Sequence, residues 1–164
     1  HVSSRRQRQM CIRDSHDTKK DLIQAKEQLS NIFGDSVIDC FVPPWNRIRE
    51  DIIPNLSELG FSGFSSFGKR SSKVHESNLK WFNTHVDVID WRNTRQFIGR
   101  DAMISQITDN LRRQRTRSGT SEPVGVLTHH LNMIESDWEE FRNIFTVLKK
   151  NNAVRFVDPL ELFH

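Results

Sequence analysis

Apolar residues recur every three to four positions in three stretches of the chain, which is the spacing of one face of an amphipathic helix. The pattern predicts a helix over 17–33, with Asp17 as its N-cap and Gly34 after its end. A second helix begins at Asp101, and a third follows the capping box of Ser136 and Glu139. The apolar faces of these helices contain Leu22, Ala25, Leu29, Ile32 and Phe33, then Ile104, Ile107 and Leu111, and finally Trp138, Phe141, Phe145 and Leu148.

Short runs rich in β-branched and aromatic residues lie between the helices and predict strands. A short helix that ends at Gly60 is expected after the first strand, with Pro54 in its first turn, and a last helix begins at Asp158-Pro159. Strands that alternate with helices favour parallel β-α units, and hence an α/β fold. The first strand is expected at a sheet edge. The five predicted strands cover 37–41, 61–65, 82–86, 124–128 and 154–157.

Chain length limits the architecture. A complete (β/α) barrel needs about 200–250 residues, so five strands within 164 residues predict either a small open sheet or the back half of a barrel. No apolar run approaches the ~20 residues that span a bilayer, and no secretory leader is visible, so localisation stays open. Position 1 is His1, and we expect the natural start of the gene to be missing.

The net charge of +3 and the pI of 9.1 come largely from one end of the chain. Residues 1–15 contain four arginines and one aspartate, and the remainder is balanced, so nucleic acid is not an expected partner. We interpret 1–15 as an unstructured or artefactual tail, because its run RQRQMCIRDS resembles translated sequencing-adapter read-through. The alternative is a basic arm that binds phosphate. Residues 16–164 form the predicted domain.

Two smaller groups of residues do not by themselves indicate a function. The basic run Arg112, Arg113, Arg115 and Arg117 is either a solvated face at a helix C-terminus or a phosphate patch. Two cysteines cannot form a disulfide framework or a four-thiolate metal site.

Candidate chemistry lies where predicted strands end, which is where α/β proteins collect their ligands. The first strand is followed by Pro43-Pro44-Trp45-Asn46-Arg47. The third runs through His85 to Asp87-Val88-Ile89-Asp90-Trp91, and the fourth is followed by Thr128-His129-His130. Aromatic, carboxylate, amide and imidazole groups at one sheet edge suit a polar, ring-shaped ligand.

Each segment has a simpler interpretation as well. The proline pair can merely stop a strand, and Asp87 and Asp90 can form a turn and a cap. Adjacent histidines on a strand point to opposite faces, so both could ligate one metal ion only with a distorted backbone. Alternation puts Leu127 and His129 on one face and Thr128 and His130 on the other. We therefore expect one histidine to face the site while the other packs or caps; His75 is expected at the surface.

Taken in order, these segments resemble the polysaccharide deacetylase family, that is, carbohydrate esterase family four and its outlying relatives. Phe41-Val42-Pro43-Pro44-Trp45-Asn46 is similar to the third motif, a strand followed by Arg-Pro-Pro-aromatic-Gly. Asp87-x-x-Asp90-Trp91 is similar to the fourth, and Leu127-Thr128-His129 to the fifth, Leu-x-His. An outlying branch with Pro-Pro-Trp-Asn-Arg, His-x-Asp and Leu-Thr-His-His is the nearest likeness. The resemblance covers roughly 17–163, the C-terminal part of such a domain.

The resemblance implies an irregular (β/α) barrel and hydrolysis of acetyl groups on amino sugars or polysaccharides. His129 would be the general acid, and Trp45 would stack on a sugar face unless it belongs to the core. Asn46 would bond a hydroxyl, and Trp91 would pack beside His129. A divalent metal such as zinc is implied for the full-length parent and none for this chain. The residues that would bind the carbohydrate substrate are Pro44, Trp45, Asn46, Asp87, Asp90, Trp91 and Leu127.

The chain also departs from the family. Neither Thr-Phe-Asp-Asp, which supplies the base and a metal ligand, nor His-x-x-x-His, which supplies the metal histidines, occurs in it. Val42 replaces the third-motif arginine, so Asp90 would lack its usual partner unless Arg47 or Arg92 substitutes, and Asn46 replaces the glycine. We therefore expect a truncated, metagenomic-like fragment that is inactive alone. A non-catalytic carbohydrate-binding or structural relative of the same fold is the alternative; the oligomeric state is not predicted.

Overall fold

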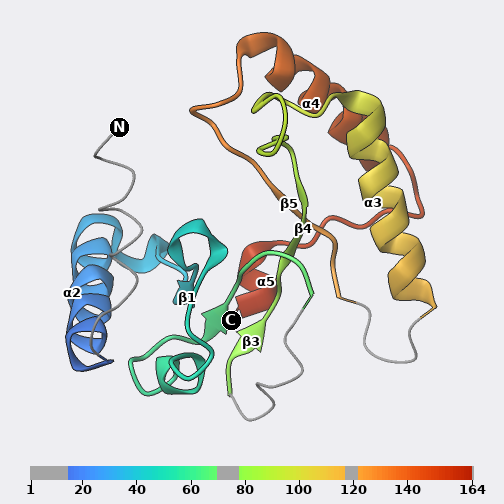
Figure 1. Cartoon of the computed structure of the whole chain (residues 1–164). Coiled ribbons are helices and arrows are strands. Elements are labelled where there is room, and N and C mark those ends of the chain that lie inside the picture. The colour runs from blue at the N-terminus through green and yellow to red at the C-terminus, as the bar shows by residue number, and fades with distance from the viewer. Residues whose placement is uncertain (1–14, 70–77, 117–121, 164) are drawn as a thin grey trace. The chain divides into compact units, whose positions relative to one another are not determined.

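The computed structural model of the chain describes residues 15–69, 78–116 and 122–163. They form two compact units, which we describe separately (Figure 1). The first unit contains 15–66, 78–81 and 160–163, and the second contains 67–69, 82–116 and 122–159. The predicted tail apart from Ser15, as well as His75 and Arg117, lies outside the described residues.

The first unit opens with helix α2, Ser15–Phe33, which confirms the predicted helix. Gly34 follows it with φ of +56° and begins the 3₁₀ turn η1, Gly34–Ser36. Leu22 packs against the core of this unit. Further along α2, however, Ile32 and Phe33 remain 69% and 58% exposed, so the predicted apolar face is covered at one end only.

A small parallel sheet forms the centre of the first unit. Its strands are β1 (Cys40–Phe41), β2 (Gly63–Phe64) and β3 (Lys80–Trp81), in the order β1-β2-β3, so β1 is an edge strand as expected. The predicted helix after β1 is instead the 3₁₀ turn η3, Ile53–Leu56, with Pro54 at its start. Helix α5, Pro159–Phe163, confirms the predicted last helix. The buried core consists of Ile52, Ile53, Leu56, Phe64, Leu79 and Trp81.

The second unit contains the two-stranded parallel sheet of β4 (Thr84–Asp87) and β5 (Gly125–Leu127). Helices α3 (Arg100–Arg115) and α4 (Glu135–Lys149) confirm the two other predicted helices (Figure 1). Both helices pack on the sheet, because they share one core with β4. That core consists of Val86, Val88, Ile89, Met103, Ile107, Met133 and Ile144.

Three local predictions are wrong. Residues 154–157 form no strand: a strand needs a ladder partner, and here Phe156 instead packs on Phe145 of α4, with ring centroids 5.7 Å apart. The predicted strand 82–86 begins too early: Phe82 and the buried Asn83 belong to no strand, and the observed strand β4 covers Thr84–Asp87. Helix α4 begins before Ser136, and the carboxylate that accepts the N-cap N–H belongs to Asp137.

The fold class is therefore mixed α/β with short parallel strands, as predicted. Within the described residues, no helix combines the length and the apolar character needed to cross a membrane.

Candidate functional site

Three predicted site residues meet in the second unit. Asp87 ends β4, and His129 lies two residues after the end of β5. Parallel pairing brings these two strand ends together, and His129 Nε2 lies 3.0 Å from Asp87 Oδ1. Trp91 Nε1 donates to Asp87 Oδ2, also at 3.0 Å. One carboxylate thus joins the imidazole and the indole.

The Asp87 carboxylate also fixes the orientation of the imidazole. An ionised carboxylate only accepts hydrogen bonds, so His129 Nε2 carries the hydrogen of this contact. Nδ1 is then the ring nitrogen that can exchange a proton with a ligand. The two side chains are 25% and 22% exposed, which keeps the pair accessible but partly shielded from water.

Trp91 packs edge-on against His129, with ring centroids 4.9 Å apart and an interplanar angle of 84°. This contact confirms the expectation that Trp91 lies beside His129. The indole remains 45% exposed, so it can contact a ligand as well.

Asp90 stabilises a turn, which is the simpler of its two interpretations. Its Oδ1 accepts the backbone N–H groups of Arg92 and Asn93, and the Asn93 side-chain amide donates to both oxygens. The amide of Asn93, followed by these backbone donors, lowers the pKa of Asp90. The turn thus supplies hydrogen-bond partners for Asp90, and Arg92, one of the two arginines that could substitute for the family's partner, contributes its backbone N–H.

A pocket of about 600 Å³ adjoins the cluster. Its walls combine carboxylates with aromatic rings and one amide from α3. His129 does not line this pocket, but it contacts two residues that do, Asp87 and Trp91. The lining includes Asp87, Asp90, Trp91, Phe67, Phe97 and Gln106. Phe67, Phe97 and Gln106 were missed in the sequence, because no local pattern distinguishes a pocket wall from a core position.

The remaining residues of the fifth motif have separate environments. Leu127 is half-buried opposite Asp87 in the strand register, and its carbonyl accepts the Val88 N–H at 3.2 Å. Leu127 therefore supports the strand pair through its backbone. Thr128 and His130 are exposed. Of the two adjacent histidines, His129 is the one against Asp87.

The third-motif residues belong to the first unit. Pro44, Trp45 and Asn46 form the 3₁₀ turn η2, Pro44–Asn46, and both Trp45 and Asn46 have left-handed backbones, with φ of +53° and +56°. Trp45 is 70% exposed, so the interpretation as a core residue is wrong. Consecutive left-handed residues other than glycine are strained, and such strain often occurs at functional sites.

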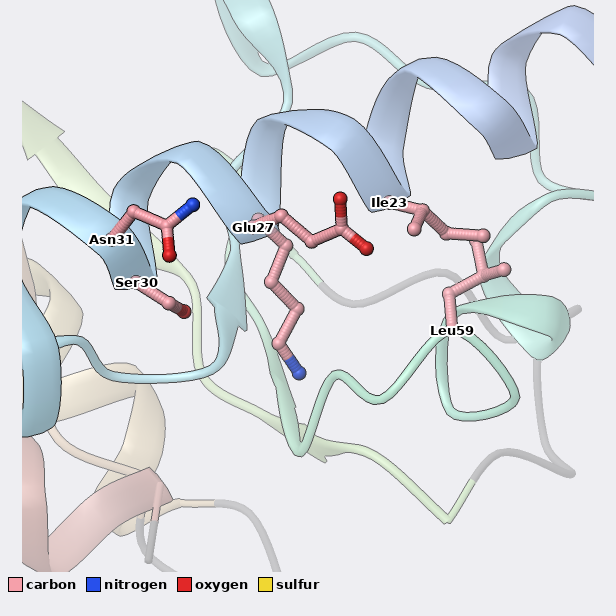
Figure 2. A pocket seen from close by; sticks show the side chains of 6 residues that line it. Ile23, Glu27, Ser30, Asn31 and Leu59 are labelled. Carbon is pink, nitrogen blue, oxygen red and sulfur yellow. The ribbon is translucent and has the colours of Figure 1, made fainter.

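The first unit also has a pocket of about 460 Å³ between α2 and the turn that follows η3 (Figure 2). None of the predicted site residues lines it. Its cation, Lys26, is occupied: Nζ donates to the Gly60 carbonyl, pairs with Asp39 at 3.0 Å and lies 5.4 Å from the Phe61 ring centroid. These contacts indicate a structural role for Lys26.

The basic end of α3 follows the pattern of a solvated face. Arg112, Arg113 and Arg115 are exposed in its last turn, where they oppose the negative end of the helix dipole. Arg112 pairs with Asp109 at 3.6 Å.

Across the described ranges, no group of three or more His, Cys, Asp or Glu side chains is placed to hold a metal ion. No protein-family model, curated protein or solved structure matches the chain.

Proposed function

We propose that the second unit carries the general-acid portion of a carbohydrate deacetylase site. The observation that supports this proposal is the 3.0 Å contact between Asp87 and His129, at the ends of two paired parallel strands and beside a pocket. A histidine oriented by a buried or half-buried carboxylate is a common general acid or base.

In the proposed reaction, water adds to the acetyl carbon, and the bond between that carbon and a sugar nitrogen or oxygen breaks to release acetate. His129 Nδ1 donates a proton to the departing amine or alcohol, which could not leave readily as an anion. Asp87 holds the ring through Nε2. Trp91 restricts the ring from the side.

The proposed substrate is an acetylated amino sugar or polysaccharide. The pocket lining combines what a sugar ring needs, namely the aromatic residues Trp91, Phe67 and Phe97 together with polar groups. Within the first unit, the exposed Trp45 would offer a separate stacking surface for a sugar, with Pro44 and Asn46 in the same turn. Asp90 shapes the pocket as the anchor of its turn rather than as a free carboxylate.

A metal ion and a base complete the reaction in the family that the chain resembles. The metal would polarise the acetyl group and activate water. The described residues do not fit such an ion, since they lack a three-ligand group, so no metal-dependent step follows from them. We therefore propose that the chain alone is inactive, and that the missing groups come from sequence upstream of it.

The finer architecture is part of the same proposal. All strand pairs of the two sheets are parallel, as in a (β/α) barrel. We propose that these strands form the C-terminal part of an irregular barrel of the deacetylase type in the full-length protein.

A second candidate is a non-catalytic carbohydrate-binding relative. Trp45 favours it, because a strained, 70% exposed tryptophan provides a stacking surface without any catalytic group. Such a protein would need the aromatic residues and not His129.

The test is titration of the isotopically labelled chain with N-acetylated chitooligosaccharides, monitored at the indole N–H signals. We expect the signals of Trp91 and Trp45 to shift, and that of Trp138 in α4 to stay unchanged as an internal control. Binding that leaves the Trp91 signal unmoved would support the binding relative instead. No shift at any indole at millimolar ligand would contradict both candidates.

A further inference from the structure

His85 occupies an irregular position in the strand pair that carries the candidate site. Thr84 lies opposite Gly125 and Val86 lies opposite Val126, so His85 is the extra residue of a β-bulge in β4. A bulge leaves its extra residue without a ladder partner and redirects a side chain. Here the redirected side chain replaces the missing ladder bond, because the Gly125 N–H donates to His85 Nδ1 at 3.2 Å.

The bulge also sets the register of the site. Without it, Val86 rather than Asp87 would lie opposite Leu127, and a shift by one residue exchanges the two faces of a strand. The strands approach closely at the bulge: a Cβ on Gly125 would lie 2.7 Å from the Asn83 carbonyl oxygen and 2.9 Å from Thr84 Cα. The contact of His85 with Gly125 therefore lies at the start of the paired strands, and Asp87 meets His129 just beyond their other end.

We propose that neutral His85 is a positioning residue, which holds β5 to β4 through the Gly125 N–H and so keeps His129 against Asp87. Protonation of Nδ1 removes the acceptor and places a new N–H donor opposite the Gly125 N–H, so that the hydrogen bond is lost. The site is thus assembled when His85 is neutral and loosened when it is protonated. The effect on deacetylation rests on the proposed function, whereas the positioning of His129 does not.

The surroundings of His85 favour its neutral form. Burial lowers its pKa below the ordinary value of 6.5, and two charged groups face it with opposite effects. Glu122, just before β5, raises the pKa, and Arg113 of α3 lowers it. Because the pKa in the folded state is depressed, stability has its full value above about pH 6.5 and declines as the pH falls below it. The site itself loosens as the pH falls through the depressed pKa of His85.

Two substitutions separate the hydrogen bond from the bulk of the side chain. In His85→Asn, the amide oxygen sits near the position of Nδ1 and can still accept the Gly125 N–H, but it does not titrate near neutral pH. In His85→Leu, the volume is similar and the acceptor is lost. His130→Asn is the matched control, because His130 is an exposed histidine near the end of the partner strand.

The readouts are amide hydrogen exchange at Gly125 and indole N–H exchange at Trp91 in the full chain, neither of which needs a substrate. We expect His85→Leu to lose about tenfold in protection at both groups, and His85→Asn and His130→Asn to stay within about threefold of the wild type. Between about pH 7.5 and about pH 5, wild-type protection should fall while that of His85→Asn stays level.

Equal losses in His85→Asn and His85→Leu would overturn the proposal, as would wild-type protection that does not change across this pH range. If His85→Leu fails to fold, the pH dependence of protection in the wild type, compared with that in His85→Asn, still tests the proposal. Retained pH-dependent protection in a protein that binds no sugar would refute the proposed function alone.

Discussion

Replacement of Asp87 should reduce the stability of the second unit in a graded manner. Its Oδ1 accepts from the Ile89 N–H and from His129 Nε2, and its Oδ2 accepts from Trp91 Nε1, all at 3.0 Å. A hydrogen bond contributes about 1 kcal/mol net, so Asp87→Ala should lower the free energy of unfolding by about 3 kcal/mol. Asp87→Asn can keep both Oδ1 contacts and should lose about 1 kcal/mol with the Trp91 contact.

Urea unfolding monitored by circular dichroism measures these differences. Asp109→Asn is the control, because the Asp109 carboxylate forms an exposed pair with Arg112, and its replacement should change stability by less than about 0.5 kcal/mol. A loss in Asp87→Ala no larger than that of the control would refute the view that this carboxylate organises the site. Equal losses in the Ala and Asn variants would refute the assignment of two donors to one oxygen.

Three further predictions concern the chain alone. Incubation with acetylated chitooligosaccharides and zinc or cobalt should release no acetate above the blank, and turnover at the usual ~1–10³ s⁻¹ would contradict the predicted inactivity. Burial raises the pKa of the Cys40 thiol to about 11. In a Cys11→Ser background, Cys40 should therefore react with iodoacetamide at neutral pH about 100-fold more slowly in the folded chain than after unfolding. Equal rates in the two states would show that the thiol is not shielded. The exposed end of the α2 apolar face should bind a hydrophobic dye, because Ile32 is 69% exposed. Ile32→Lys should reduce the dye fluorescence more than Asn31→Lys does. Equal fluorescence in the two variants would show that the dye binds elsewhere.

Long helices were predictable because their signal is local. The periodic spacing of apolar residues predicted α2, α3 and α4 to within a few residues. The start of α4 was less certain, because both Ser136 and Asp137 are residue types found at helix starts, and only the backbone decides which one takes part in the cap.

Strands were predicted less well, since a strand depends on a partner that is distant in sequence. Val154 to Val157 has strand-forming residues, yet Phe156 packs on a helix. The same limit applies to the site. Alternation along β5 indicated that one histidine faces the site, and His129 is the one that contacts Asp87. The bulge at His85 depends on the pairing of β4 with β5 and has no signal in either strand alone.

The turnover of two variants tests most directly whether His129 acts as the general acid. In the protein expressed with its upstream sequence, His129→Ala should lower kcat for acetylated chitooligosaccharides by about 10²–10⁴-fold, with KM nearly unchanged. The loss should shrink for aryl acetates, whose leaving group needs no proton. His130→Ala should retain kcat, because His130 is exposed and lies beyond the contact with Asp87. If His130→Ala loses kcat while His129→Ala keeps it, the account is wrong.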